Sequence, residues 1–228
     1  MSMRDSLLRM AARLPLLILA TSFGCRPAPP VDVSLLTGEP CEPPCWQGLT
    51  PGVSTEGELY EFLRTSELVD QSTLFQGDIT LGSGEVIGVT IQWWSSANMA
   101  RSPRQIGNHC DLRDGVLHWA TIWLDSEVTL ADLLERYGEP YKWSFTWISI
   151  DMPDLDVALH YPNHGFTAHL TLPADDTWLR PESRVDLVRY HVVVPPADFL
   201  ELGPEAGYFH AYKADSLRDW QGYREIEW

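Results

Sequence analysis

Lysine is nearly absent from this chain of 228 residues, because only Lys142 and Lys213 occur. Lysine and arginine together number 16 against 32 aspartates and glutamates, which gives a formal net charge of −16 at pH 7. Residues 1–24 carry a local charge of +2, so the remainder carries −18. Such a surface repels phosphate backbones and anionic lipids. The composition therefore argues against nucleic-acid binding, and any membrane attachment must rest on something other than charge.

The chain also lacks an apolar run long enough to span a membrane, which takes roughly 20 residues. Its apolar run at 14–23 is about half that length and follows Arg4, Arg9 and Arg13. A basic start, a short apolar stretch and a small residue are typical of a secretory signal. The sequence therefore predicts an exported protein with a signal segment over 1–24.

The residues around Gly24-Cys25 are similar to a bacterial lipoprotein signal, which ends in a small residue followed by cysteine. The resemblance implies cleavage before Cys25 and lipid on its thiol and amine. Ordinary cleavage that leaves Cys25 unmodified is the alternative. Residues 25–40 then form a proline-rich spacer between the anchor and the folded part. The predicted location is extracytoplasmic, on the cell membrane or outer envelope, held by lipid.

Three further cysteines remain, and an oxidising compartment favours a disulfide among them. The sequence favours a local Cys41–Cys45 bond with Cys110 left over. A disulfide from Cys110 to the amino-terminal segment that holds Cys41 and Cys45 is the alternative, since a longer closed loop stabilises the fold more in the chain-entropy model. A zinc site of Cys41, Cys45, His109 and Cys110 lacks a standard ligand spacing. We therefore predict no metal.

Motifs for catalysis are also missing, so the sequence predicts no catalytic residue and no cofactor. There is no nucleophile elbow and no phosphate-binding loop. His160, His164 and His169 cluster on a predicted hairpin, where we expect them on the solvent face. Ten tryptophans are present, most of them expected in the core. Trp46 and Trp220, in loops near glycine, are the candidates for exposed ligand-binding rings.

Periodicity indicates two amphipathic helices and several strands. Thr55 with Glu58, and Thr129 with Asp132, have the spacing of capping boxes. The segment 101–115, which holds Cys110, is typical of a loop. The expected elements are helices within 50–66 and 128–140, strands 84–94, 115–125, 141–151 and 184–195, a hairpin over 156–173 with the turn PNHG, and a short helix over 196–203.

Each predicted helix precedes a block of strands. We therefore expect an α+β fold of two related units, each a helix followed by a small antiparallel sheet. The units are a first one over 41–114 and a second over 115–228 with a carboxy-terminal extension.

GLTPGVSTEGEL (48–59) and VTLADLLERYGEP (128–140), each leading into aromatic strands, resemble small bacterial envelope lipoproteins of the BamE/SmpA–OmlA type. The resemblance implies an α+β fold with a binding or scaffolding role, and it supplies no catalytic residues. The expected function is a non-enzymatic binding or scaffolding module of the cell envelope, whose partner is an envelope protein or a glycan. The alternative is an envelope hydrolase that acts on glycans or peptides through carboxylates the sequence does not single out.

Overall fold

The computed structural model describes residues 32–95, 107–147, 154–199 and 217–226. The elements follow one another as α1 (Ser34–Thr37), α2 (Glu56–Thr65), η1 (Gln71–Thr73), β1 (Phe75–Thr80), β2 (Val86–Trp93), β3 (Asn108–Arg113), β4 (Val116–Trp123), α3 (Leu130–Tyr137), β5 (Lys142–Trp147), β6 (Leu155–Tyr161), η3 (Pro162–His164), β7 (Phe166–Leu172) and β8 (Leu187–His191).

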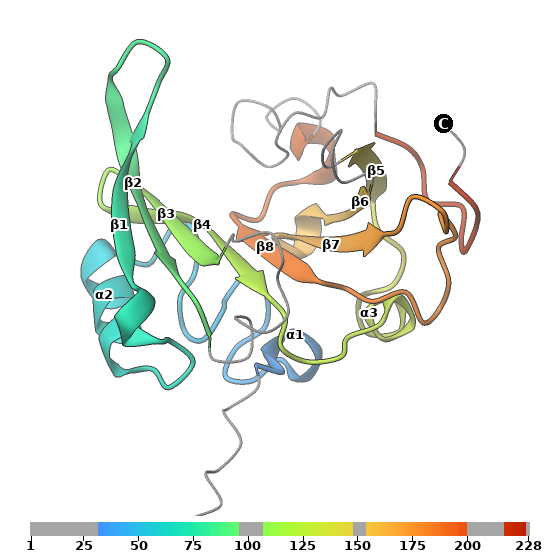
Figure 1. Ribbon diagram of the computed structural model, residues 1–228, viewed down its shortest axis with the longest axis horizontal. Coiled ribbons are helices and arrows are strands. Elements are labelled where there is room, and N and C mark those ends of the chain that lie inside the picture. Colours follow the sequence, from blue (N-terminus) through green and yellow to red (C-terminus); the bar gives the residue numbers. More distant parts are fainter. Residues whose placement is uncertain (1–31, 96–106, 148–153, 200–216, 227–228) are drawn as a thin grey trace, which may run out of the picture.

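All eight strands join one antiparallel sheet in the order β1-β2-β3-β4-β8-β7-β6-β5 (Figure 1). The expected two units, each with its own small sheet, are therefore wrong. Strand β4 pairs with β8 from Trp119–His191 to Trp123–Leu187, which makes the sheet continuous. Two separate sheets would have left the backbone groups along these strands unpaired, which is unfavourable for buried strands.

The expected division between residues 114 and 115 falls inside a tight turn. Asp114 and Gly115 connect β3 to β4, with φ angles of 51° and 72°. Two consecutive residues with positive φ are characteristic of the type I′ hairpin turn, whose twist matches that of antiparallel strands. The two strands on either side of this turn are directly hydrogen-bonded neighbours.

Both predicted capping boxes are confirmed. In α2, the Thr55 side chain accepts from the Glu58 backbone N–H, and the Glu58 carboxylate accepts from the Thr55 backbone N–H. Thr129 and Asp132 make the same reciprocal pair at the start of α3. These bonds satisfy amide groups that have no partner within the first helical turn.

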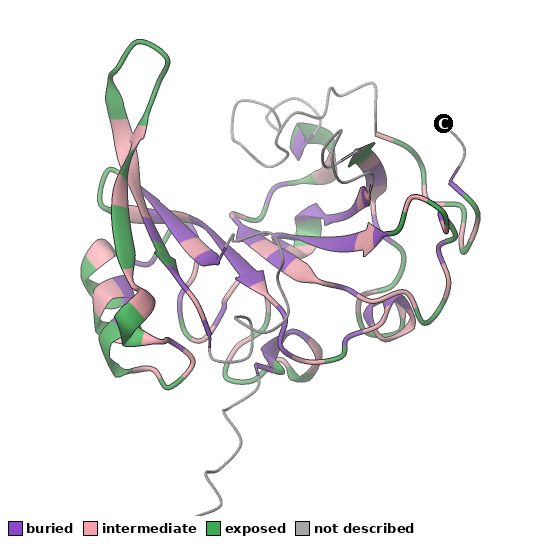
Figure 2. Ribbon diagram, in the orientation of Figure 1, coloured by how far each residue is buried: buried purple, intermediate pink, exposed green. Residues whose placement is uncertain are grey.

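Helices α1, α2 and α3 lie along one face of the sheet, and the main core lies between these helices and the sheet (Figures 1 and 2). Leu59 and Leu63 of α2 and Leu130 and Leu133 of α3 are fully buried there. On the opposite face, the segment from 192 to 199 crosses the β5–β8 half, where Val194 and Phe199 pack against Ala158. The second face is therefore partly covered too.

Two details of strand geometry differ from the sequence interpretation. Residues 108–113 were expected in a loop but form β3 near the middle of the sheet. The register between β3 and β4 shifts at Asp111/Leu112, so β4 contains a bulge that brings both Leu117 and Ala120 to the core face. A bulge adds one residue to one strand and breaks the strict alternation of faces.

The predicted hairpin over 156–173, with its turn at PNHG (162–165), is confirmed. Tyr161 pairs with Phe166 and His160 with Thr167 across β6 and β7. The turn between them is the short helix η3, which ends at Gly165 with φ of 64°. A Cβ at Gly165 would lie 2.6 Å from the His191 carbonyl oxygen, so glycine is required there by space as well as by conformation.

Candidate functional site

The outer edge of β1 is the candidate functional site, because it is an open sheet edge. Strand β1 has β2 as its neighbour on one side, and none of the described residues pairs with its other side. The far edge of the sheet is different. There, Trp143 and Arg218 exchange two backbone hydrogen bonds of 3.0 and 2.8 Å, so the carboxy-terminal segment covers part of β5. The described chain thus covers one edge of its sheet and leaves the other available.

The open edge belongs to a hairpin that projects beyond the rest of the sheet (Figure 1). Its turn closes with a hydrogen bond from the Leu81 N–H to the Glu85 carbonyl, and Gly84 supplies a φ of 86°. The hairpin becomes more exposed toward its tip, where Leu81 and Val86 are both exposed (Figure 2). Such a hairpin presents backbone groups and side chains to an incoming chain.

The two faces of β1 carry different side chains, because successive residues of a strand alternate. Phe75, Gly77 and Ile79 lie on the face opposite the helices, and Phe75 is 60% exposed. Its ring lies close to Gly77, where an added Cβ would meet the Phe75 ring at 3.1 Å. Gln76 points toward α2 and accepts a 2.6 Å hydrogen bond from the Tyr60 hydroxyl. This bond connects the edge strand to the helix beneath it.

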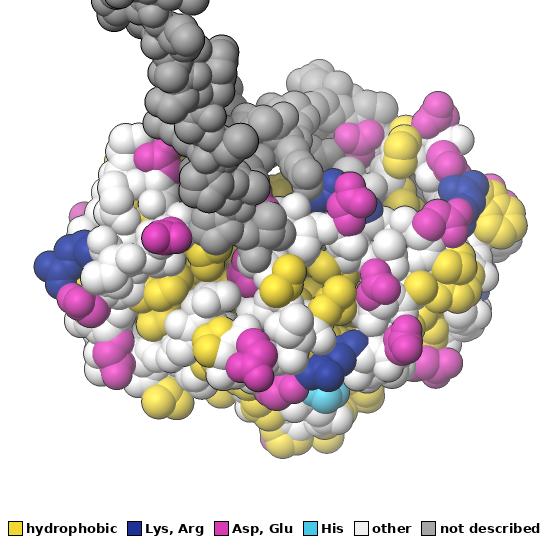
Figure 3. All heavy atoms as spheres, turned by 90° about the horizontal axis from the view of Figure 1, so that it is seen from below, with side chains coloured by type: hydrophobic (Ala, Val, Ile, Leu, Met, Phe, Trp, Pro, Cys, Tyr) yellow, Lys and Arg dark blue, Asp and Glu magenta, His cyan; other side chains and the backbone are white. Residues whose placement is uncertain are grey.

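The surroundings of the edge are acidic. Segment 54–93 contains seven acidic residues and one basic residue, Arg64, which pairs with Glu61 at 2.9 Å. Capping hydrogen bonds from Thr55 hold the pKa of Glu58 below its usual value, so this carboxylate stays ionised at neutral pH. Figure 3, which views the molecule from the helix side, shows acidic side chains spread over the described surface with few lysines or arginines among them.

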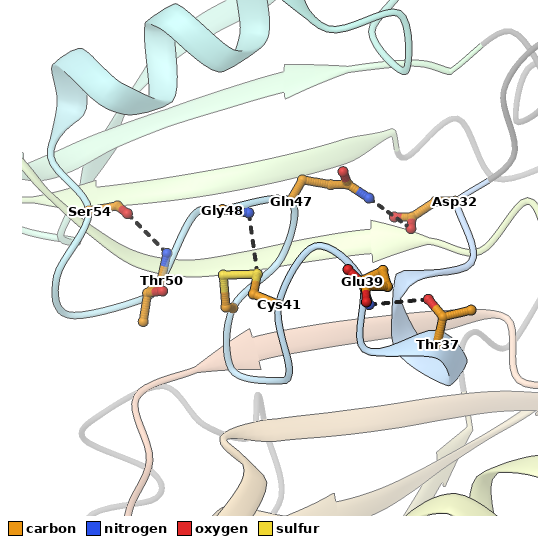
Figure 4. The surroundings of a disulfide bond; sticks show 9 residues. Asp32, Thr37, Glu39, Cys41, Gln47, Gly48, Thr50 and Ser54 are labelled. Carbon is orange, nitrogen blue, oxygen red and sulfur yellow. Dashed lines mark hydrogen bonds between the residues drawn. A yellow bond between two sulfur atoms is a disulfide. The ribbon is translucent and has the colours of Figure 1, made fainter.

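The four cysteines, for which the sequence predicted different roles, lie in three different parts of the chain. Cys25 lies outside the described residues. Cys41 and Cys45 are joined by a disulfide with an S–S distance of 2.05 Å (Figure 4). The Gly48 backbone N–H lies 3.4 Å from the Cys41 sulfur, which ties the disulfide loop to the next turn. Cys110 is free and fully buried in β3, and burial raises the pKa of its thiol well above the usual value. The Cys110 thiol is therefore a core group.

Trp46 is a core residue, and the expectation of an exposed ring there is wrong. Its side chain is 2% exposed and stacks on Trp93 at a centroid distance of 5.9 Å. The indole N–H donates to the carboxylate of Asp32. The same carboxylate accepts from the Gln47 amide (Figure 4). A loop can bury a large aromatic ring when its polar atom finds a partner. Trp220 is half-buried against the core.

His160 and His169 are also inside the protein, and the expectation that they lie on the solvent face is wrong. His160 is completely buried and His169 is 9% exposed. The face they occupy is covered in part by Phe199, whose ring centroid lies 5.3 Å from that of His160. His169 contacts the Asp156 carboxylate at 3.2 Å. His164 is half-buried in the turn.

A row of hydrogen bonds runs through this buried face across four strands. Ser144 Oγ lies 3.0 Å from His160 Nε2, His160 Nδ1 lies 3.2 Å from Thr167 Oγ1, and Thr167 Oγ1 lies 3.5 Å from His191 Nε2. His191 Nδ1 then lies 2.9 Å from the Val192 carbonyl oxygen. That carbonyl can only accept, so His191 donates from Nδ1. Each hydroxyl or imidazole N–H then donates to the next group, with both rings neutral.

Burial accounts for the neutrality of both rings. Desolvation lowers the pKa of His191 to about 4, and it holds the pKa of His160 well below its usual value. All four side chains of the row are essentially inaccessible to solvent, so no substrate can reach them in this conformation. We therefore assign the Ser144–His160–Thr167–His191 row to the interior of the protein.

A wider alignment of polar residues was not predicted from the sequence. Polar residues stand side by side across seven strands on the face opposite the helices: Gln92, His109, Thr121, Arg189, Thr167, His160 and Lys142. Arg189 donates to Thr121 and lies 5.8 Å from the Trp119 ring centroid, and Arg113 lies 5.2 Å from the same ring. Single strands show polar alternation, but only the register places these residues in line.

Two of the buried carboxylates are engaged in structural hydrogen bonds. Asp32 accepts from the Ser34 backbone and from Trp46. Asp125 accepts from the Ser95 hydroxyl at 2.9 Å. Across the described ranges, no three metal-ligating side chains come together into a group that could hold an ion. These contacts give the hydrolase alternative no support.

Within the described ranges, every helix is too short or too polar to cross a membrane.

Strand β1 and its open edge were also not predicted from the sequence, because Gly77 interrupts a run of only six residues. The turn-like GSGE (82–85) is the signal that could have indicated β1. It precedes a predicted strand, and a turn in that place favours a partner strand before it.

Compared with protein-family models, curated proteins and solved structures, this chain matches none of them.

Proposed function

We propose that this protein is an exported, lipid-anchored module of the cell envelope that binds or scaffolds a partner without catalysis. The sequence supports the export and the anchor, through the basic and apolar segment before Gly24-Cys25 and the spacer after it. Attachment by acyl chains suits a protein with a formal charge of −16, because charge itself would repel an anionic membrane.

The observation that carries the binding proposal is the open edge of β1. A strand with unpaired backbone groups along one side can accept a further strand, and proteins commonly protect such edges with lysine, proline or a covering loop. Strand β1 has neither lysine nor proline, and no described loop covers it. The other edge of the sheet receives such a cover from Arg218. The difference between the two edges favours a role for β1 in recognition.

Changing Cys25→Ser tests the anchor. We expect the unchanged protein in the membrane fraction, starting at Cys25 and carrying acyl mass, because lipid on this cysteine supplies the attachment. The variant should lose the acyl mass and leave the membrane fraction. Fractionation and mass spectrometry of the intact protein measure both. A full-length chain in the cytoplasm that retains residues 1–24 would contradict export and anchoring together.

A photo-reactive amino acid in place of Phe75 tests the binding role in cells. We expect a covalent adduct of defined mass, because this position lies on the open edge and is 60% exposed. The same amino acid in place of Tyr223, which is 44% exposed and belongs to the carboxy-terminal segment that pairs with β5 at the other end of the sheet, is the matched control. Equal labelling at both positions, or none at Phe75, would count against recognition through β1.

A further inference from the structure

We propose that β1 accepts an extended segment of a partner protein in which basic and apolar side chains alternate. This inference rests on the proposed binding function and specifies its partner. An added strand would pair its backbone with β1 and place its own side chains alternately on the two faces of the sheet. Each face of β1 therefore sets the chemistry of every second residue in the partner.

One face of the edge favours apolar partner residues. Phe75 and Ile79 lie on this face with Gly77 between them, and the Phe75 ring lies close to Gly77. Phe75 is 60% exposed and Ile79 is half-buried. An apolar side chain placed next to Gly77 in an added strand would contact both residues. Aromatic and branched cross-strand neighbours stabilise such pairs.

The other face favours basic partner residues. Gln76, Asp78 and Thr80 lie on this face, which is the side of the sheet that α2 covers. The segment 54–93 carries seven acidic residues against one basic residue, and Arg64 is already paired with Glu61. These carboxylates attract a lysine or arginine of the partner that lies opposite Asp78, and they repel an acidic residue in the same place.

The same charge pattern disfavours a second copy of this chain as the occupant. Pairing β1 with another β1 would bring together two hairpins whose only charged residues, Asp78 and Glu85, are acidic. The shift in register at Ile79/Thr80 also limits the regular edge to about the length of Phe75–Ile79. A short basic and apolar segment fits this edge better than the whole hairpin of a second copy.

The test uses two labelled hexapeptides, alternating Lys-Val and alternating Glu-Val, each N-methylated along one edge to prevent self-association. The protein is used as its host produces it. We expect the Lys-Val peptide to bind about tenfold more tightly than the Glu-Val peptide, with an affinity that falls as salt rises. Amide exchange of residues 75–79 should slow when the Lys-Val peptide is bound. Equal affinity for the two peptides would overturn the proposal.

Two charge reversals locate the site. Asp78→Lys is expected to weaken binding of the Lys-Val peptide about tenfold, and Glu85→Lys, which makes the same change in net charge at the hairpin turn, should weaken it at most about threefold. Equal effects of the two variants would overturn the proposal, because the attraction would then come from net charge alone.

Sedimentation tests a second copy as the occupant. A protein that forms dimers, which dissociate in the Asp78→Lys variant, would overturn the proposal in favour of self-association through β1. An adduct at Phe75 without a difference between the peptides would leave the binding function standing and refute the partner chemistry.

Discussion

Trp46→Ala is expected to lower the free energy of unfolding by about 3–5 kcal/mol, the usual cost of removing a buried tryptophan. The indole is 2% exposed, stacks on Trp93 and meets Phe62 edge-on at a centroid distance of 5.0 Å. Its removal leaves a cavity between the disulfide loop, α2 and β2. It also removes one of the donors to the buried Asp32 carboxylate, which keeps those from Ser34 and Gln47.

Urea unfolding followed by circular dichroism measures this loss. Trp178→Ala is the matched control, because Trp178 is 46% exposed, and its truncation should cost far less. Similar losses from the two substitutions would mean that Trp46 is not a core residue, and an exposed ligand-binding ring at that position would again be possible.

Acid is expected to destabilise the fold as the pH falls from about 6.5 toward 4. His191 is neutral in the native state because burial lowers its pKa to about 4, while in the unfolded chain its pKa returns to about 6.5. Between these values the unfolded state binds more protons than the native state, so the free energy of unfolding falls as the pH falls. His191 alone contributes a loss of about 3 kcal/mol over this interval. His160, whose pKa burial also lowers, adds to it in the same direction.

Urea unfolding at several pH values between 7.5 and 4 tests this. His191→Gln should be less stable at pH 7.5, because the hydrogen-bonded row is disturbed, but should lose about 3 kcal/mol less on acidification. Thr167→Val is the control: it breaks the same row without removing a titrating group, so it should lose stability at every pH and keep the steep acid dependence. The same acid dependence for the parent and His191→Gln would refute the buried neutral imidazole.

Local patterns predicted local structure well. The capping boxes at Thr55 and Thr129, and the Tyr161–Phe166 register of the hairpin, depend on contacts between residues close in sequence. Strand β3 was missed because the segment begins with turn-forming residues, although His109, Asp111 and Arg113 alternate with apolar residues as they would in a strand. Pairing on both sides, with β2 and β4, decides that this segment is a strand.

The burial of Trp46 and of the histidines was harder to predict from the sequence. Trp46 was expected on the surface because it lies in a loop near glycine, but the disulfide loop folds it against Trp93 and Phe62. The histidines were expected in water because polar residues alternate along the hairpin. Segment 192–199 covers part of that face, and alternation within one strand carries no information about such a cover.

The sequence by itself determined the capped starts of α2 and α3, the turn of the 156–173 hairpin, the strongly negative charge and the prediction of export, since each depends on neighbouring residues or on simple sums. Only the tertiary structure decided that β4 pairs with β8, that no described residue pairs with the outer side of β1 and that polar residues align across seven strands. These features depend on register between strands far apart in the chain. Register is set by burying all the strands together, which no local segment specifies.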